Sequence, residues 1–490
     1  MRFISTFPVT AVRVAAMGLA LCGAEAYGQF VSNAQPLPAA QANTSTTQST
    51  SGSQQSNTPY QGSVVKEKAT AGQLSLSLQD AIERGLKYNL GYILQNEAQL
   101  GASGQRLQAL QTLLPTAQGG ARITVAQTDL AAEGLRITGF PKVIGPYGSV
   151  DFRASVVMSL LNLPALQNYL AARHNFQAAK LSVQDARDMV VLAVGNAYLT
   201  VIADQARVTN AGAQVRSTKT SLDQAVANHT AGTSPLLDEL RARVDYQTQE
   251  QTLIQAQNQL QKDKIALARA IGLPLEQEFV LSDSVPYTPL DNITADEAAK
   301  QALAHRKDLA ATRQQAAEAS SIATGAHEER LPSVGFTGDY GATGINLADL
   351  HGSGEAIGQA NVPLFEEAKI RGDERIADAQ KRQQKAQVSN LEAQVVADVR
   401  DSLLDIEAAA KLVEVARSNV DLATEELSEA QQRFAAGVSD NLSVVQAQAS
   451  VAQANEQYVS SLYQHNMAKL SLARAMGVAQ QDYSHYLGGK

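Results

Sequence analysis

Two very long stretches without proline constrain the fold of this chain more than any other feature of its sequence. They run from about residue 165 to 230 and from about 366 to 435, are rich in Ala and Gln, and place apolar side chains three or four residues apart. As an α-helix, a stretch of about 66 residues extends roughly 100 Å. No compact domain is that wide, so the sequence predicts an elongated helical protein.

The chain also contains the same module twice. Leu114-Pro115-Thr116 is matched 217 residues later by Leu331-Pro332-Ser333, whereas the sequence LARAIG at 267–272 is matched 205 residues later by LARAMG at 472–477. The second copy therefore lacks 12 residues in one loop between the proline and the long stretch. Shared offsets over such distances indicate an internal duplication.

Each copy changes from a helix pattern to a strand pattern and back. A helical segment, 77–114 in the first copy, ends at the Leu-Pro pair and is followed by a region with alternating apolar and polar residues. The alternation is clear over 150–158 and weaker over 334–340 and 356–364. We expect one antiparallel hairpin per copy, with a loop at 129–146 in the first. The two shorter helices of a copy, laid end to end, match the length of its long helix.

The amino terminus is typical of an exported protein. Two arginines precede the apolar run 14–21, and two alanines follow it at 24 and 26, which is the layout of a secretory signal peptide. Cys22, the single cysteine, ends that run, and we favour its removal with the signal over its lipidation. The tract 32–72 is rich in Gln, Ser, Thr and Asn, and this composition predicts a flexible leader.

Composition and missing motifs exclude several functions. Forty Lys and Arg against 48 Asp and Glu, a net charge of −8, argue against a protein that binds nucleic acid. One cysteine cannot form a disulfide framework or a cysteine metal cluster. No P-loop, zinc-protease or nucleophile-elbow motif is present, and the seven histidines are scattered. We therefore expect no catalytic residue, no cofactor and no metal.

Membrane insertion is predicted for the strands and not for the helices. After the signal, no apolar run approaches the roughly 20 residues of a spanning helix. Four strands cannot close a barrel, and unpaired strand edges are not tolerated in lipid. If the hairpins enter a membrane, several chains must therefore pool their strands. Two chains would give eight strands and three would give twelve, with the apolar strand face toward lipid and the polar face toward water.

The features described so far occur in the same order in one known family. They are the duplicated module, the Leu-Pro pairs before the strands, Pro363-Leu364-Phe365 after the fourth strand, and RFAAGVS at 433–439. Over about 76–477 the chain resembles the TolC family of outer-membrane efflux proteins. It departs from the family at Asn89-Leu90 and at Arg306-Lys307-Asp308, where the family often has proline.

The resemblance implies a homotrimer in the outer membrane of a Gram-negative-type bacterium. Its fold class would be mostly α with a small transmembrane β part. Each chain would add four strands to a 12-stranded β-barrel and two long helices to an α-helical periplasmic barrel. The trimer would contact outer-membrane lipid, bind a periplasmic adaptor, or membrane fusion protein, and serve an inner-membrane pump. Tripartite efflux and type I secretion both use such a channel.

The predicted layout follows from the two copies. In chain order it comprises a signal peptide (1–28), a flexible polar leader (29–75), helices of repeat 1 (76–115), hairpin 1 (116–163), tunnel helices of repeat 1 (164–272), an equatorial connector (273–294), helices of repeat 2 (295–332), hairpin 2 (333–365), tunnel helices of repeat 2 (366–477) and a C-terminal tail (478–490).

The turns between long and short helices are the candidate functional residues. In each, a glycine with φ > 0 would end the long helix and a serine would cap the next one. The resemblance implies that the turns form the tunnel tip, which docks the adaptor; the residues concerned are Gly232, Thr233, Ser234, Gly437, Val438 and Ser439. Asp238 and Asp440 are candidates for an acidic entrance that attracts cations, although an acid at a helix start is equally ordinary.

Two other classes of protein were weighed against a channel. A periplasmic adaptor has one helical hairpin flanked by small β domains, whereas this chain has two helical hairpins and little β structure outside the strand pairs. A soluble coiled-coil structural protein would need no alternating strands between its helices. Both alternatives are therefore less consistent with the sequence.

Overall fold

The computed structural model describes residues 59–66, 68–69, 72–130, 132, 134, 139, 141–283, 287–290, 293–436, 438–439 and 441–487. They belong to one compact unit, Ser56–Lys490. The predicted signal peptide with Cys22 lies outside the described residues, as do Gly437 and Asp440.

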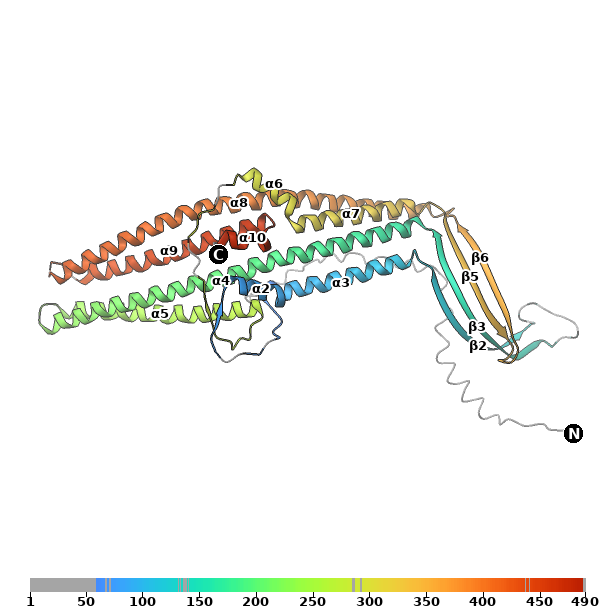
Figure 1. Cartoon of the computed structure of the whole chain (residues 1–490), viewed down its shortest axis with the longest axis horizontal. Helices are drawn as coiled ribbons and strands as arrows, with labels where there is room; N and C mark the ends of the chain where they lie inside the picture. The colour runs from blue at the N-terminus through green and yellow to red at the C-terminus, as the bar shows by residue number, and fades with distance from the viewer. Residues whose placement is uncertain are drawn as a thin grey trace, which may run out of the picture. The chain divides into compact units, whose positions relative to one another are not determined.

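Two helices of nearly equal length dominate this unit. α4 (Leu163–Thr230) has 68 residues and α8 (Glu367–Ala435) has 69. The Asn162 side chain caps α4 by accepting a 2.9 Å hydrogen bond from the backbone N–H of Ala165, and Pro164 suits the first turn. α5 (Leu236–Ile271) runs back along α4, and α9 (Asn441–Ala475) runs back along α8 (Figure 1).

The expected single helix at 77–114 is wrong, because the chain breaks it at Asn89. The break gives α2 (Leu78–Tyr88) and α3 (Leu90–Gln111). Asn89 is extended, with φ −65° and ψ 133°, and its side chain accepts a 2.9 Å hydrogen bond from the N–H of Gly91 while donating one of 2.6 Å to the carbonyl of Tyr60. An asparagine can therefore make this break without proline, since its side chain satisfies the freed backbone groups.

The second half breaks in the same place by different chemistry. α6 (Ala295–His305) and α7 (Lys307–Glu328) meet at Arg306, which is also extended. Its buried guanidinium is 2.6 Å from the carboxylates of both Asp308 and Asp398, the second of which lies on α8. This paired charge fixes the break against the neighbouring helix.

The described residues of the predicted leader, 29–75, make contacts with the rest of the fold. η1 (Pro59–Gln61) packs beside α3, and β1 (Leu74–Leu76) pairs in parallel with β4 (Phe279–Leu281). The Gln277 side chain adds a 2.9 Å hydrogen bond to the carbonyl of Gly72. The leader prediction was therefore too long at its C-terminal end, because Leu76 belongs to the hydrophobic core and draws the preceding residues against the helices.

The core lies where the middle of α4 meets the ends of the shorter helices. Val194 and Tyr198 are fully buried there with Leu470 of α9, and the Tyr198 hydroxyl donates to the carbonyl of Leu76 at 3.1 Å. Gly195 permits a close approach, since a Cβ there would lie 2.6 Å from the Leu470 side chain. α10 (Ala479–Leu487) closes the core against α9.

The expectation that no helix is apolar enough to cross a membrane was wrong for α4. By length and composition α4 qualifies, with an 18-residue window of mean hydropathy 1.4. Half of that window is buried, and α4 packs against α3, α5, α7 and α9. The buried half of this window faces neighbouring helices, as it does in a core helix.

Four antiparallel strands form a sheet at one end of the long helices. They are β2 (Thr116–Asp129), β3 (Val143–Leu161), β5 (Ser333–Gly344) and β6 (Leu350–Asn361), in the order β2-β3-β5-β6. β3 begins at Val143, inside the loop expected at 129–146, because Val143 and Ile144 still pair with Asp129 and Thr128. The α4–α5 and α8–α9 turns lie at the opposite end of the helices from this sheet (Figure 1).

Candidate functional site: the strand sheet and the helical tip

The sheet separates apolar from polar side chains across all four strands. Phe152 is paired with Ala121 on one side and Ala342 on the other, so these three residues share a face. Along the regular part of the sheet, the described residues on that face include no charged side chain; they are Ala117, Gly119, Ala121, Ile123, Val125, Val150, Phe152, Ala154, Val156, Met158, Val334, Phe336, Gly338, Tyr340, Ala342, Gly344, Leu350, Gly352, Gly354, Ala356, Gly358 and Ala360. A continuous uncharged face of this kind suits lipid.

The opposite face carries the charges. Arg153 of β3 lies 2.5 Å from the carboxylate of Asp339 on β5 and 3.4 Å from that of Asp151 on its own strand. Its guanidinium also donates to the Ser353 hydroxyl of β6 at 3.3 Å. The contacts join the hairpin of the first half to that of the second on the face that would meet water.

The turn between α4 and α5 has the conformation that its glycine predicts. Gly232 has φ +74°, and the N–H of Thr233 donates to the carbonyl of Asn228 at 2.9 Å. This 6→1 bond is the hydrogen bond of a Schellman helix end, which requires the left-handed residue that precedes it. The Thr233 hydroxyl donates to the same carbonyl at 2.9 Å, so the turn is held twice.

The second turn repeats that bond 205 positions later. The N–H of Val438 donates to the carbonyl of Arg433 at 3.0 Å, while the Val438 side chain is 72% exposed. The Ser439 hydroxyl lies 2.5 Å from the Ser443 hydroxyl. Gly437 and Asp440, predicted to belong to this turn, lie outside the described residues. Both turns sit at the same end of the helices (Figure 1).

One expectation about the turns was wrong: Ser234 does not cap α5. The N-cap position is Pro235, and no side chain caps the helix there. Instead the Ser234 carbonyl lies 3.2 Å from Nδ1 of His229, at the end of α4. Proline fixes φ without needing a cap, and it shifts the start of the helix by one residue from the position that the serine suggested.

Asp238 lies at the junction of the two helical hairpins. It is 7% exposed, and its carboxylate is 3.9 Å from the guanidinium of Arg241. Its main-chain carbonyl accepts a 3.4 Å hydrogen bond from the buried side-chain amide of Asn441, the first residue of α9. The residue therefore touches both hairpins, and its carboxylate is largely covered by its own chain.

An apolar groove near the turns was missed at the level of sequence. It has a volume of about 490 Å³ and runs between α5 and α9; its lining residues are Leu237, Leu240, Arg241, Val244, Asp245, Thr248, Leu442 and Val445. Burial raises the pKa of the Asp245 carboxyl at its edge. The spacing Leu237, Leu240, Val244 on an otherwise polar helix was the available signal, because it repeats every three or four residues.

Outside the core, the α4–α5 and α8–α9 helical hairpins meet through amide and hydroxyl side chains. Gln448 of α9 donates to the hydroxyls of Ser221 and Ser217 on α4, at 2.9 and 3.2 Å. Gln214 of α4 donates in return to the main-chain carbonyl of Gln448 at 3.0 Å. Hydrogen bonds between polar groups therefore hold this part of the interface, whereas apolar packing holds the core.

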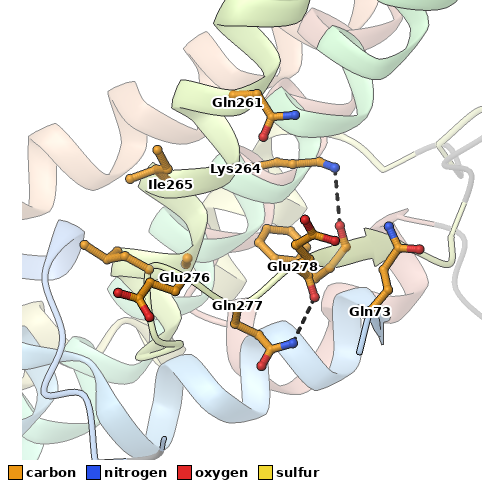
Figure 2. Close-up of a pocket in the computed structure, with 10 residues that line it drawn as sticks. Gln73, Gln261, Lys264, Ile265, Glu276, Gln277 and Glu278 are labelled. Atoms are coloured by element: carbon orange, nitrogen blue, oxygen red, sulfur yellow. Dashed lines mark hydrogen bonds between the residues drawn. The ribbon is translucent and has the colours of Figure 1, made fainter. Parts of the chain in front are cut away.

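A second hollow, of about 310 Å³, lies between the end of α5 and the pair of β1 and β4. Figure 2 shows Lys264 of α5 donating to the carbonyl of Phe279 at 3.3 Å, and Gln277 donating to that of Glu278 at 3.0 Å. These bonds tie the connector to α5. Among the described residues no cluster of three or more His, Cys, Asp or Glu side chains could hold a metal ion.

A family model matches most of the chain. Residues 142–273 and 298–478, which include β3, β5, β6, both turns and both long helices, match the family described as outer membrane efflux protein. The chain belongs to this family. The predicted resemblance to outer-membrane efflux proteins and the predicted location in the outer membrane, with a large helical periplasmic part, are thereby confirmed.

Curated relatives and solved structures agree with this assignment. SepC, a probable efflux pump outer membrane protein of Pseudomonas putida, is 25% identical over 323 residues, and the match spans 65% of this chain and 65% of SepC. OpmQ, a pyoverdine export outer membrane protein of Pseudomonas putida, is 22% identical over 309 residues, 63% of this chain and 66% of OpmQ. The chain thus matches slightly less than two thirds of the length of these relatives.

Solved channels share the fold at low sequence identity. The outer membrane protein VceC of Vibrio cholerae has a TM-score of 0.73 at 20% identity, over 82% of this chain and 96% of VceC. The CmeC outer membrane channel of Campylobacter jejuni has a TM-score of 0.74 at 16% identity, over 86% and 92%. The predominantly helical fold with a small β part is therefore the fold of these channels.

Proposed function

We propose that this chain is one subunit of a trimeric outer-membrane channel that exports substrates delivered by an inner-membrane pump through a periplasmic adaptor. The observation that carries the proposal is the four-stranded sheet with its uncharged face and its two open edges, β2 and β6. In lipid those edges must pair, and pairing with further copies of the same sheet is the direct way to do so. Three copies would give twelve strands.

The internal duplication belongs to the same proposal. Each half contributes a strand pair, a broken helix pair, one long helix and one returning helix, in the same order. In a trimer, six similar units would then surround one axis. The polar sheet face with Arg153 and Asp339 would line the water-filled passage, and the α4 and α8 helices would continue it into the periplasm.

We place adaptor docking at the helical tip. The two turns and the apolar groove between α5 and α9 lie within the same end of the protein, and Leu237, Leu240 and Val244 leave apolar surface exposed there. A helical hairpin of an adaptor, with an apolar side chain at its tip, would fit a groove lined in this way. Relatives described as toluene, solvent and pyoverdine export proteins favour efflux over protein secretion.

Native mass spectrometry of the detergent-extracted protein tests the trimer, and a mass of three chains is expected. In-cell cross-linking to the adaptor tests the groove. Leu240→Glu should abolish the cross-link, because it places a charge in an apolar groove. Gln247→Glu, at an exposed residue of α5 two turns further on that does not line the groove, should keep it. A monomer in the first measurement would reject the channel, and equal cross-linking of both variants would reject docking at the groove.

A further inference from the structure

The connector between the two halves crosses α9 above two buried basic side chains. Lys469 is 1% exposed, and its ammonium donates to the carbonyl of Thr288 at 3.0 Å and to the Thr288 hydroxyl at 2.8 Å. His465, one turn earlier on α9, is also 1% exposed, and its ring lies 4.8 Å from the ring of Tyr287 at an angle of 46°. Residues 287–290, here called the clasp, therefore cover both groups.

Neither basic group has a charge partner in the part of the chain that the structure describes. The contacts of Lys469 are the two to Thr288, and both ring nitrogens of His465 are buried without a hydrogen-bond partner. The two charged side chains of α8 that line the cavity beside His465 are paired elsewhere: Arg400 with Asp296 at 3.4 Å, and Glu407 with Lys411 at 2.7 Å. Lys469 is a buried cation whose partners are a carbonyl and a hydroxyl. A second buried positive charge beside it would therefore be energetically costly.

An apolar cavity lies directly under the clasp. Its volume is about 640 Å³; its lining residues are Tyr287, Pro289, Leu290, Ile293, Ala295, Arg400, Leu403, Leu404, Ile406, Glu407, Ala410 and His465. The clasp supplies one wall, α8 supplies the other, and His465 forms part of the floor. Leu404 is already 64% exposed, so the cavity is open on its α8 side, and movement of the clasp would widen it.

We propose that residues 287–290 act as an acid-released clasp between the two halves of the chain: a proton on His465 opens it, because the buried site cannot hold a second positive charge beside Lys469. Opening would free residues 287–290 from α9 and widen the cavity along α8. The inference does not depend on the number of subunits or on the partner of the channel.

The direction of the pH effect follows from the environment of His465. Burial, and second the positive charge of Lys469, lower the pKa of the His465 imidazole to about 4. When the clasp is open and the ring is in water, its pKa returns to about 6.5. The closed form is therefore favoured at neutral pH, and it loses stability as the pH falls from about 6.5 toward 4. One proton is taken up on opening, so the open population should rise by up to about tenfold per pH unit in that range.

Hydrogen–deuterium exchange of the intact, detergent-extracted protein tests the proposal. Exchange is measured from pH 7.5 to 4.5, corrected for the intrinsic pH dependence, and compared between a clasp peptide and a peptide from the middle of α4. We expect the opening of the clasp to rise by about tenfold or more over this range in the wild type. Exchange at α4 should stay constant.

Four variants separate the effect of the histidine from that of its surroundings. His465→Phe keeps a ring against Tyr287, and His465→Gln keeps a neutral polar group; both should remove the pH dependence. His305→Gln, at an exposed histidine of α6, should retain it. Thr288→Val should open the clasp more at every pH but leave the pH slope unchanged. A wild type without pH-dependent opening, or a slope that survives in both His465 variants, would overturn the proposal.

Discussion

The side-chain amide of Gln448 on α9 donates a 2.9 Å hydrogen bond to the Ser221 hydroxyl on α4, and both residues are buried. This bond joins the two helical hairpins in the half of the molecule nearer the turns. It lies beyond the apolar core formed around Tyr198 and Leu470. The hairpins are therefore coupled there by polar groups, whose loss is costly in the closed arrangement but which water can satisfy once the helices part.

Gln448→Ala should loosen this contact. It leaves the hydroxyls of Ser217 and Ser221 without their donor in a buried interface, at a cost of about 1–3 kcal/mol. Faster hydrogen exchange in the first half of α9 is expected, together with a higher resting conductance of the channel in planar bilayers. Gln446→Ala, on the exposed side of the same helix, is the control. Unchanged exchange in the Gln448 variant would show that the interface is held by packing alone.

Charge on the uncharged face of the sheet should block insertion. Phe152→Arg or Val156→Arg should each destabilise the inserted protein by about 2–4 kcal/mol if the residue lies near the middle of the bilayer. Ser155→Arg points to the face of Asp339 and should be tolerated, since Ser155 and Asp339 are directly paired. Heat stability and yield in the outer-membrane fraction are the measurements. Equal effects at positions 155 and 156 would contradict the assigned faces.

A β-branched residue at Gly232 should strain the first turn. The φ of +74° costs an L-residue about 1–2 kcal/mol, although a Cβ there would meet no atom within 4 Å. Gly232→Val should therefore weaken adaptor cross-linking and export while the oligomer survives, because the sheet is far away. Gly232→Asn is the matched variant, since asparagine tolerates this conformation. Normal export by Gly232→Val would make the turn a helix end without a docking role.

Asp238→Asn tests whether the tip acids set the potential at the entrance. If they do, the cation preference of single channels should fall, because a negative charge near a narrow mouth attracts cations. Glu239→Gln is the matched control: its carboxylate is paired with Arg243 at 2.7 Å on the same helix. Unchanged selectivity in the Asp238 variant would identify this residue, only 7% exposed, as an acid of the helix start whose carboxylate does not set the potential at the entrance.

The sequence was sufficient for features that depend on periodicity. A helix such as α4 and a strand such as β3 are visible in spacing alone, and so are the two faces of the sheet around Phe152 and Ser155. It was insufficient where a side chain replaces an expected signal. Asn89 and Arg306 break helices without proline: Asn89 caps α3 with its side-chain amide, whereas the guanidinium of Arg306 caps no helix and is held by the carboxylates of Asp308 and Asp398. Contacts such as Gln448 with Ser221, 227 residues apart, and Lys469 with Thr288 leave no local pattern to read.

Asp204 gives a pH dependence with a definite sign. It is 2% exposed on α4, and its carboxylate lies 2.8 Å from the guanidinium of Arg207, which also contacts Glu456 of α9 at 2.9 Å. Burial, and second the neighbouring carboxyl of Asp263, raise the pKa of Asp204 to about 6. The folded protein therefore keeps this proton where the unfolded chain, with a pKa near 3.9, has lost it.

Asp204 should thus contribute less to stability as the pH rises from about 4 to 6, and its full penalty should remain above 6. We expect the difference in Tm between Asp204→Asn and the wild type to shift in favour of the variant between pH 4.5 and 7.5, because asparagine mimics the protonated acid. Taking the difference cancels the other titrating groups. Asp223→Asn, at an exposed carboxylate beside Lys219, should show no such shift. A difference that is constant with pH, or that moves toward the wild type, would mean that Arg207 keeps Asp204 ionised throughout this range.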